Sequence, residues 1–183
     1  MVSILSIRCL LLAMIVAQPV LISGPTAATA EEVDVSAVGA AAPLTPAELV
    51  LLYADRTWIW ENGAAYFAKD GRQLRAWTDG ANASIGQGRW LVTKNGKLCM
   101  NAKWKTLAGS TQGRTCFSHH RLGGTIYQMK DPSGSWYVFQ ASPAQPGQEY
   151  DKFKSGDTTA ATFKKMHQMI SPDRQPAPVK SGG

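Results

Sequence analysis

The feature that most constrains the fold is a series of short β-type runs between residues 57 and 140. These runs are rich in Trp, Tyr, Phe, Ile and Val and alternate with turn dipeptides such as Asp70-Gly71 and Asn95-Gly96. The predicted strands are 57–60, 64–68, 73–78, 88–93, 98–104, 114–119, 125–130 and 136–140. Because such short connections join antiparallel neighbours, the sequence predicts a mainly β fold. We expect a meander of about eight strands forming a curved sheet or small barrel, with a two-sheet sandwich as the alternative.

One short helix is expected before the strands and one after them. Thr45 and Glu48 have the spacing of a capping box, with Pro46 at the first helical position, which predicts a helix over 46–55. Asp157 is a suitable N-cap for a second helix that ends near residue 170. We therefore expect a single β-rich domain with flanking helices over residues 44–170, preceded by a linker over 31–43 and followed by a disordered tail over 171–183.

The N-terminus has the features of an export signal. A single charge at Arg8 precedes a short apolar run over residues 9–17, and Ala28-Thr29-Ala30 ends a stretch of small residues. This pattern predicts a secretory signal peptide over residues 1–30, cleaved after Ala30, and hence a periplasmic or secreted protein. The alternative, an uncleaved anchor, lacks a stop-transfer pattern. The mature chain would have 153 residues and no transmembrane span, since a spanning helix needs about 20 apolar residues.

Two of the three cysteines, Cys99 and Cys116, remain after cleavage in a compartment that favours disulfides. If the hairpin between them turns within residues 105–110, Cys99 lies opposite Cys116, at a distance that a disulfide can bridge. In the preceding hairpin, a two-residue turn would place Trp90 on the polar face. A three-residue loop with a left-handed Gly96 places Trp90 opposite Met100 instead, so the apolar pattern favours the longer loop.

The same registers gather positive charge on the disulfide face. Arg89, Asn101 and Arg114 are expected to form one row across three strands, and Lys103 lies one row along. Residues 56–140 contain twelve Lys or Arg against four acids, a local net charge of +8. These residues are candidate ligands for a carboxylate, sulfate or phosphate, although charges also commonly do no more than face water. An exported basic domain points to an anionic glycan, a wall polymer or a lipid surface rather than nucleic acid.

The aromatic residues mostly fit a core. Trp90, Trp104 and Trp136 fall at inward positions of the predicted strands. The positions of Trp58, Trp60 and Trp77 are less determined, and one of these three is a candidate for lining a groove.

The sequence offers little for catalysis, cofactors or metals. Three of the four acids between residues 56 and 140 sit in turns, which leaves Glu61 without a second carboxylate for acid–base work. Cys116 and His119 point to opposite faces of a strand, so the pair His119-His120 does not predict a metal site. We expect no catalytic residue, no cofactor and no metal.

Several segments together resemble a known family. They are 57–63 (TWIWENG), Gly88-Arg89-Trp90, Leu98-Cys99, Cys116-Phe117 and Trp136-Tyr137. Over roughly residues 45–140 the chain resembles the exported bacterial proteins grouped as domain of unknown function 995. The resemblance implies an envelope protein with both cysteines in place, and it brings no activity or assigned site.

Three functional hypotheses follow. The first is a non-catalytic binding or interaction module for an anionic partner, acting through Arg89, Arg114 and Lys103. The second is an envelope hydrolase that uses Glu61 with His119 or His120. The third is an inhibitor of a wall-degrading enzyme, which the basic charge disfavours if the target is itself basic.

Overall fold

The computed structural model describes residues 34–171, which fall within one compact unit of the chain. The expected signal peptide and residues 172–183 of the expected tail lie outside these residues. The described part is mainly β: its antiparallel strands form one sheet, curled into a half-barrel, with three α-helices. No helix among residues 34–171 is long and apolar enough to cross a membrane.

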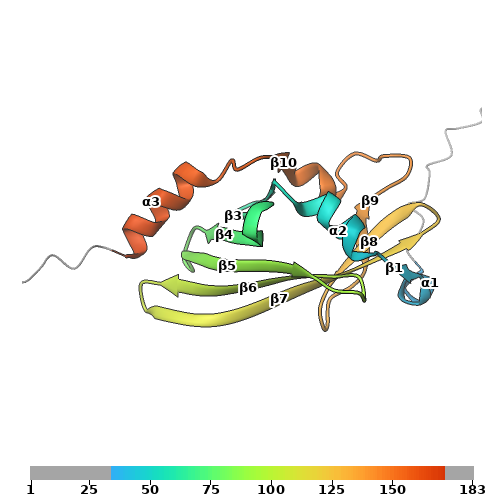
Figure 1. Ribbon diagram of the computed structural model, residues 1–183, viewed down its shortest axis with the longest axis horizontal. Helices are drawn as coiled ribbons and strands as arrows, with labels where there is room; N and C mark the ends of the chain where they lie inside the picture. The colour runs from blue at the N-terminus through green and yellow to red at the C-terminus, as the bar shows by residue number, and fades with distance from the viewer. Residues whose placement is uncertain (1–33, 172–183) are drawn as a thin grey trace, which may run out of the picture. The chain divides into compact units, whose positions relative to one another are not determined.

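All eight expected strands are present, in meander order. They are β2 Arg56–Trp60, β3 Gly63–Phe67, β4 Gln73–Thr78, β5 Ser84–Val92, β6 Lys97–Thr106, β7 Gly109–Leu122, β8 Thr125–Lys130 and β9 Tyr137–Gln140. Figure 1 shows the long strands β5, β6 and β7 running side by side. Two short strands were not expected. The first, β1 Ala42–Pro43, pairs with β7, and β10 Phe153–Ser155 extends the sheet beyond β2.

The expected linker is partly wrong, because it contains both β1 and the helix α1, Val35–Ala40. The side chain of Asp34 caps α1 by accepting hydrogen bonds from the backbone N–H groups of Ser36 and Ala37. Val38 is fully buried, and its carbonyl lies 2.8 Å from Nδ1 of His120. A capped turn and one buried side chain are therefore enough to fix this segment on β7, although its sequence has no clear period.

The expected capping box is present at the start of α2, Pro46–Tyr53. The backbone N–H of Thr45 donates to Glu48 Oε2 at 2.8 Å, and Glu48 N–H donates to Thr45 Oγ1. These hydrogen bonds satisfy N–H groups that a helix start otherwise leaves unpaired. The helix ends at Tyr53, two residues before the expected position, and its Tyr53 side chain is fully buried against the inner face of the half-barrel.

The last helix, α3 Ala160–Ile170, starts later than expected, because Asp157 is not its N-cap. Instead, Asp157 accepts a 2.6 Å ion-pair contact from Arg75 on β4 and hydrogen bonds from Thr159. One side of α3 is apolar, and its residues Phe163, Met166 and Ile170 are buried. These three residues pack with Ile85 of β5 on the outer face of the sheet, the face turned away from the half-barrel's interior.

The β5–β6 connection has the predicted longer loop. Trp90 pairs with Met100 and Val92 with Leu98, while Gly96 adopts the left-handed conformation with φ of +68°. A Cβ at Gly96 would also lie 2.7 Å from the carbonyl oxygen of His119. Both the left-handed backbone and this close contact therefore exclude residues larger than glycine. The inner face therefore carries a continuous core that includes Trp90, Leu98, Met100 and Phe117.

Trp136 is not in that core, contrary to expectation. Its ring is partly exposed and packs on His120, with ring centroids 4.6 Å apart. Trp77 lies on the outer face, where it packs against the cluster under α3.

Candidate functional site

The predicted row of polar and basic residues is present on the outer face. Arg89 pairs with Asn101, and Asn101 pairs with Arg114, so these residues cross β5, β6 and β7 at one level. Lys103 lies two residues farther along β6, flanked by Gln87 and Gln112. Since neighbouring strands are about 4.8 Å apart, the backbones of Arg89 and Arg114 are roughly 10 Å apart. Their long side chains can therefore reach one anionic group together.

These cations are accessible. Arg89, Lys103 and Arg114 are exposed, and Asn101 is partly buried. Within residues 34–171 the ion pairs that form involve other cations, namely Arg75, Lys97, Arg121 and Lys152. In residues 34–171, no carboxylate forms an ion pair with Arg89, Lys103 or Arg114, so these three cations can pair with a partner.

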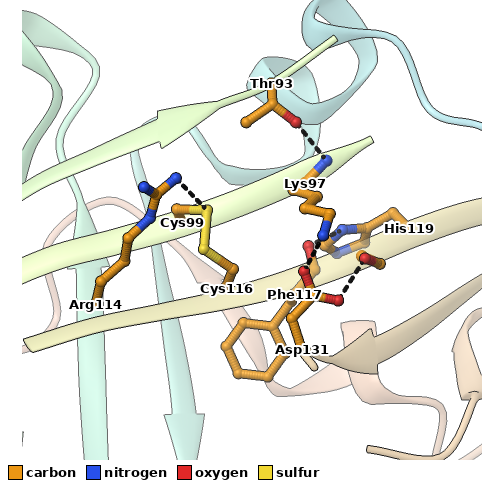
Figure 2. The surroundings of a disulfide bond; sticks show 9 residues. Thr93, Lys97, Cys99, Arg114, Cys116, Phe117, His119 and Asp131 are labelled. Atoms are coloured by element: carbon orange, nitrogen blue, oxygen red, sulfur yellow. Dashed lines mark hydrogen bonds and ion pairs between the residues drawn. A yellow bond between two sulfur atoms is a disulfide. The ribbon is translucent and has the colours of Figure 1, made fainter. Parts of the chain in front are cut away.

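The Cys99–Cys116 disulfide lies beside this row, as predicted (Figure 2). Cys99 is fully buried, and the guanidinium of Arg114 lies over it with Nη2 3.4 Å from Sγ. The disulfide joins the two strands that carry Asn101, Lys103 and Arg114, so it fixes the spacing between them.

On the other side of the disulfide, Asp131 forms an ion pair with Lys97 and accepts a 2.7 Å hydrogen bond from Ser118 (Figure 2). Partial burial acts to raise the pKa of Asp131, but the hydrogen bonds from Lys97 and Ser118 outweigh it and lower this pKa below its usual value. This pairing removes Lys97 from the set of available cations.

A hollow of about 370 Å³ extends the basic surface toward α3. Its lining comprises Ile85, Gln87, Lys103, Lys105 and His167. The ammonium group of Lys105 donates a 2.6 Å hydrogen bond to the hydroxyl of Ser171, just after α3. Sequence reasoning did not find this hollow, because it depends on where α3 packs.

The two ends of the half-barrel differ. At the first, the closed end, lie the β3–β4, β5–β6 and β7–β8 connections together with α2. At the second, the open end, lie the β2–β3, β4–β5 and β6–β7 connections. The Tyr53 ring fills the closed end, with ring centroids 5.1 Å from Phe67, 5.5 Å from His119 and 5.8 Å from Phe139.

A buried chain of hydrogen bonds runs through the closed end. The imidazole Nδ1 of His119 lies 3.1 Å from the carbonyl oxygen of Phe117, which can only accept, so Nδ1 carries the proton. The Nε2 atom then accepts from the hydroxyl of Tyr53 at 2.8 Å, and that hydroxyl accepts from Gln128 at 2.6 Å. The hydroxyl of Tyr137 donates to Gln128 Oε1.

Burial determines the charge state of this chain. Removal from water lowers the pKa of His119 to about 3, so the imidazole is neutral at physiological pH. Burial likewise raises the pKa of Tyr53 and of Tyr137 above the usual value. The chain is therefore a neutral, satisfied network that holds the closed end together rather than an acid–base site.

The open end contains an aromatic pocket of about 330 Å³. Its lining residues are Trp58, Trp60, Met100, Trp104, Thr115, Phe117 and Tyr137. We expected that one of Trp58, Trp60 and Trp77 would line a groove; Trp58 and Trp60 both do. The sequence signal that could have located this pocket is the set of inward glycines at 63, 86 and 113, which make room for large rings.

The residues of the hydrolase hypothesis are not brought together. Glu61 is exposed in the β2–β3 turn at the open end, whereas His119 is buried at the closed end. The five residues of β2 separate these ends, roughly 16 Å at 3.3 Å per residue. His120 is engaged by Val38 and Trp136. This geometry gives no support to proton transfer between Glu61 and either histidine.

In the described part of the chain, no three His, Cys, Asp or Glu residues gather as metal ligands would.

Comparison with known proteins gives one match. No curated protein and no solved structure matches the chain. The family described as "Protein of unknown function (DUF995)" matches over residues 19–159, which is most of the sequence and includes every strand of the half-barrel. The residues that carried the resemblance in the sequence, including the paired cysteines, lie inside this range. The chain therefore belongs to the DUF995 family.

Proposed function

We propose that this protein is a non-catalytic binding module, exported from the cytoplasm, that engages an anionic partner through the outer face of its sheet. The observation that supports this proposal is the row of exposed cations at Arg89, Lys103 and Arg114, which have no carboxylate partner within the described residues. Asn101 lies between the two arginines and adds a hydrogen-bonding amide.

The surface that carries these cations is rigid, which supports a role in binding. The disulfide joins β6 to β7 within the surface, and Arg114 lies against its sulfur. Because the strands are fixed, little backbone entropy is lost when a partner binds. Arginine also offers a planar fork that pairs with carboxylate, sulfate or phosphate through two hydrogen bonds.

The partner class follows from charge and compartment. The predicted export signal places the domain outside the cytoplasm, where anionic glycans, wall polymers and lipid head groups are available. All three present the anionic oxygens that arginine recognises.

The test is charge reversal at Arg89 and Arg114 in one variant, with Lys94 and Lys154 reversed together as a control of equal charge change. Binding is measured to heparin, to a polyuronate and to vesicles that contain phosphatidylglycerol. We expect Arg89→Glu/Arg114→Glu to weaken binding more than tenfold, since each cation contributes about 1 kcal/mol at an anionic surface. We expect the control variant to keep most of the affinity.

The three probes separate sulfate, carboxylate and phosphate partners, and binding should weaken as salt is raised. Equal loss of binding in both variants would show that net charge alone is responsible and would contradict the proposed surface. Unchanged binding in the Arg89→Glu/Arg114→Glu variant would do the same.

A further inference from the structure

The aromatic pocket at the open end is suited to an apolar and uncharged group. None of its lining residues is charged, and its exposed surface is almost wholly apolar. Two of its polar groups are already engaged: the indole N–H of Trp58 donates to Glu149 at 2.8 Å, and the hydroxyl of Tyr137 donates to Gln128. A group that enters the pocket must therefore need no hydrogen bonds from these two residues.

Two tryptophans of the pocket are half-buried and rest on glycines. A Cβ at Gly63 would lie 2.4 Å from the ring nitrogen of Trp60, and one at Gly86 would lie 2.8 Å from the ring of Trp104. Glycine at these positions lets both rings lie close to the sheet, and part of each ring stays exposed. Covering this aromatic surface with another apolar group is favourable, because it removes apolar area from water.

A path along the surface leads from the C-terminal end of the described chain to this pocket. On the outer face, the ammonium of Lys105 donates a 2.6 Å hydrogen bond to Ser171, the residue that follows α3. Lys105 is paired with Ser110, which lines a hollow of about 270 Å³ at the β6–β7 turn. Trp104 lines both this hollow and the aromatic pocket, so the two adjoin at the rim of the sheet.

The chain that follows Ser171 is long enough for this path. Strand β6 ends at Thr106, so the rim of the sheet is roughly 7 Å from Lys105. Crossing the rim adds on the order of 10 Å, and the return along the inner face to Trp104 is about as long as the first part. Residues 172–179 span about 25 Å at 3.1 Å per residue in a polyproline II conformation, which covers the whole path. The other end of the described chain begins with α1, which contacts β7 near the closed end.

The sequence that this path brings to the pocket has the matching chemistry. Residues 176–179 are Pro-Ala-Pro-Val, an apolar and uncharged run. Proline restricts both its own backbone and that of the preceding residue, so such a run favours the polyproline II conformation. Proline-rich segments of this kind dock into grooves lined by aromatic side chains, because they lose little conformational entropy on binding.

From these observations we propose that the chain's own C-terminal segment occupies the aromatic pocket, with residues 176–179 against the rings of Trp60 and Trp104. The segment is a built-in cover for the open end, and any apolar partner of the pocket must first displace it. This site is separate from the surface proposed for an anionic partner, since the pocket lies on the inner face and the cationic row on the outer face.

The test uses the mature protein labelled with ¹⁵N, because the indole N–H signal of each tryptophan reports on its surroundings. A chain shortened to end at Ser171 should show shifted signals for Trp60 and Trp104. The signal of Trp136, which packs on His120 near the closed end, should not move. A chain shortened only by residues 180–183 is the matched control and should keep the native signals.

A second variant tests the prolines in the full mature chain. Pro176→Gly/Pro178→Gly should move the same two indole signals to their positions in the shortened chain, whereas Asp173→Gly/Ser181→Gly, which places two glycines outside the run, should not. Because the double proline variant changes no charge, its binding to heparin and to anionic vesicles should match that of the native protein. This comparison separates the proposal from the proposed function.

A synthetic peptide of residues 172–183 tests the pocket directly. Added to the shortened chain, it should return the two indole signals to their native positions in a saturable way. The peptide with both prolines replaced by glycine should bind about tenfold more weakly, since its backbone is less ordered and two rings are lost. Thr115→Phe, which adds a ring inside the pocket, should weaken binding of the native peptide about as much. Gln112→Phe adds the same ring to the outer face of the same strand and should leave peptide binding unchanged.

Three results would overturn the proposal. One is native indole signals for Trp60 and Trp104 in the Pro176→Gly/Pro178→Gly variant, which carries the test by itself if the shortened chain does not fold. Another is peptide binding that neither the glycines nor Thr115→Phe weakens. The third is a dependence of the native signals on protein concentration, which would place the segment of a second copy in the pocket instead.

Discussion

The two ends of the half-barrel are built from the same strands but are completed differently. At the closed end, α2 supplies Tyr53, and a chain of hydrogen bonds joins this residue to His119 and Gln128, both fully buried. At the open end no α-helix among residues 34–171 covers the interior, and the half-buried rings of Trp60 and Trp104 lie on glycines around a pocket. In this meander, the buried contacts that stabilise the fold are therefore concentrated at the closed end, whereas residues 34–171 leave the interior at the open end accessible.

The largest expected effect tests this division directly. Tyr53→Ala should destabilise the protein by about 3–5 kcal/mol, because it removes a fully buried ring and leaves polar groups unpaired. Trp60→Ala removes a larger side chain from the open end, but the loss should stay below about 2 kcal/mol, since this ring is only half-buried. Denaturant unfolding measures both values. Similar losses would show that the open end contributes to stability as much as the closed end does.

The disulfide gives the next largest effect. Its cysteines are 17 residues apart and enclose the part of the β6–β7 hairpin that extends to the open end. Replacing both cysteines with serine should cost about 3 kcal/mol, the value expected for a loop of this length. Amide exchange should accelerate more within residues 100–115 than around Tyr53. A reductant should destabilise the native protein and leave the double-serine variant unaffected; equal sensitivity of both would contradict the assignment.

The smallest effect is the pH dependence of the closed end. Because the pKa of His119 falls from 6.5 to about 3 on folding, the unfolded chain binds a proton that the folded chain does not between these values. Stability is therefore fully present above pH 6.5 and decreases as the pH falls, by about 1.4 kcal/mol per pH unit below pH 6.

Unfolding measurements at pH 7, 6 and 5 test this effect. His119→Gln should abolish the decrease over this range, and His120→Gln, at the neighbouring position, should preserve it. A decrease that persists in His119→Gln would show that another group is responsible.

The β-hairpins could be predicted from the sequence because their information is local. The alternation of Trp90, Leu98 and Met100 selected the longer loop at Gly96, and a hairpin turn assumed within residues 105–110 placed Cys99 opposite Cys116. The structure confirms both registers. At the Gly96 loop, a slip of one residue would have moved Trp90 to the polar face, so the apolar pattern favoured one register there.

The features that sequence reasoning missed depend on distant contacts. Tyr53 lies within the helix predicted over 46–55, but its partners His119 and Gln128 lie 66 and 75 residues away. Likewise, Asp157 has the residue type of a helix cap, but in the structure it pairs with Arg75, 82 residues away, and does not cap α3. Neither contact leaves a periodic signal, because each depends on how the sheet curls.

The pairing of β10 with β2 has a consequence for how the chain folds. Strands β2 to β9 each pair with neighbours in sequence, so their hairpins can form early and locally. In contrast, β10 returns to β2, and the hydroxyl of Thr57 donates to the carbonyl of Gly156, 99 residues away, at 2.7 Å. Closing so large a loop has an entropic cost, and the contacts that compensate for this cost form only once the loop has closed. We therefore expect β10 to join the sheet last, completing the half-barrel after the meander has formed.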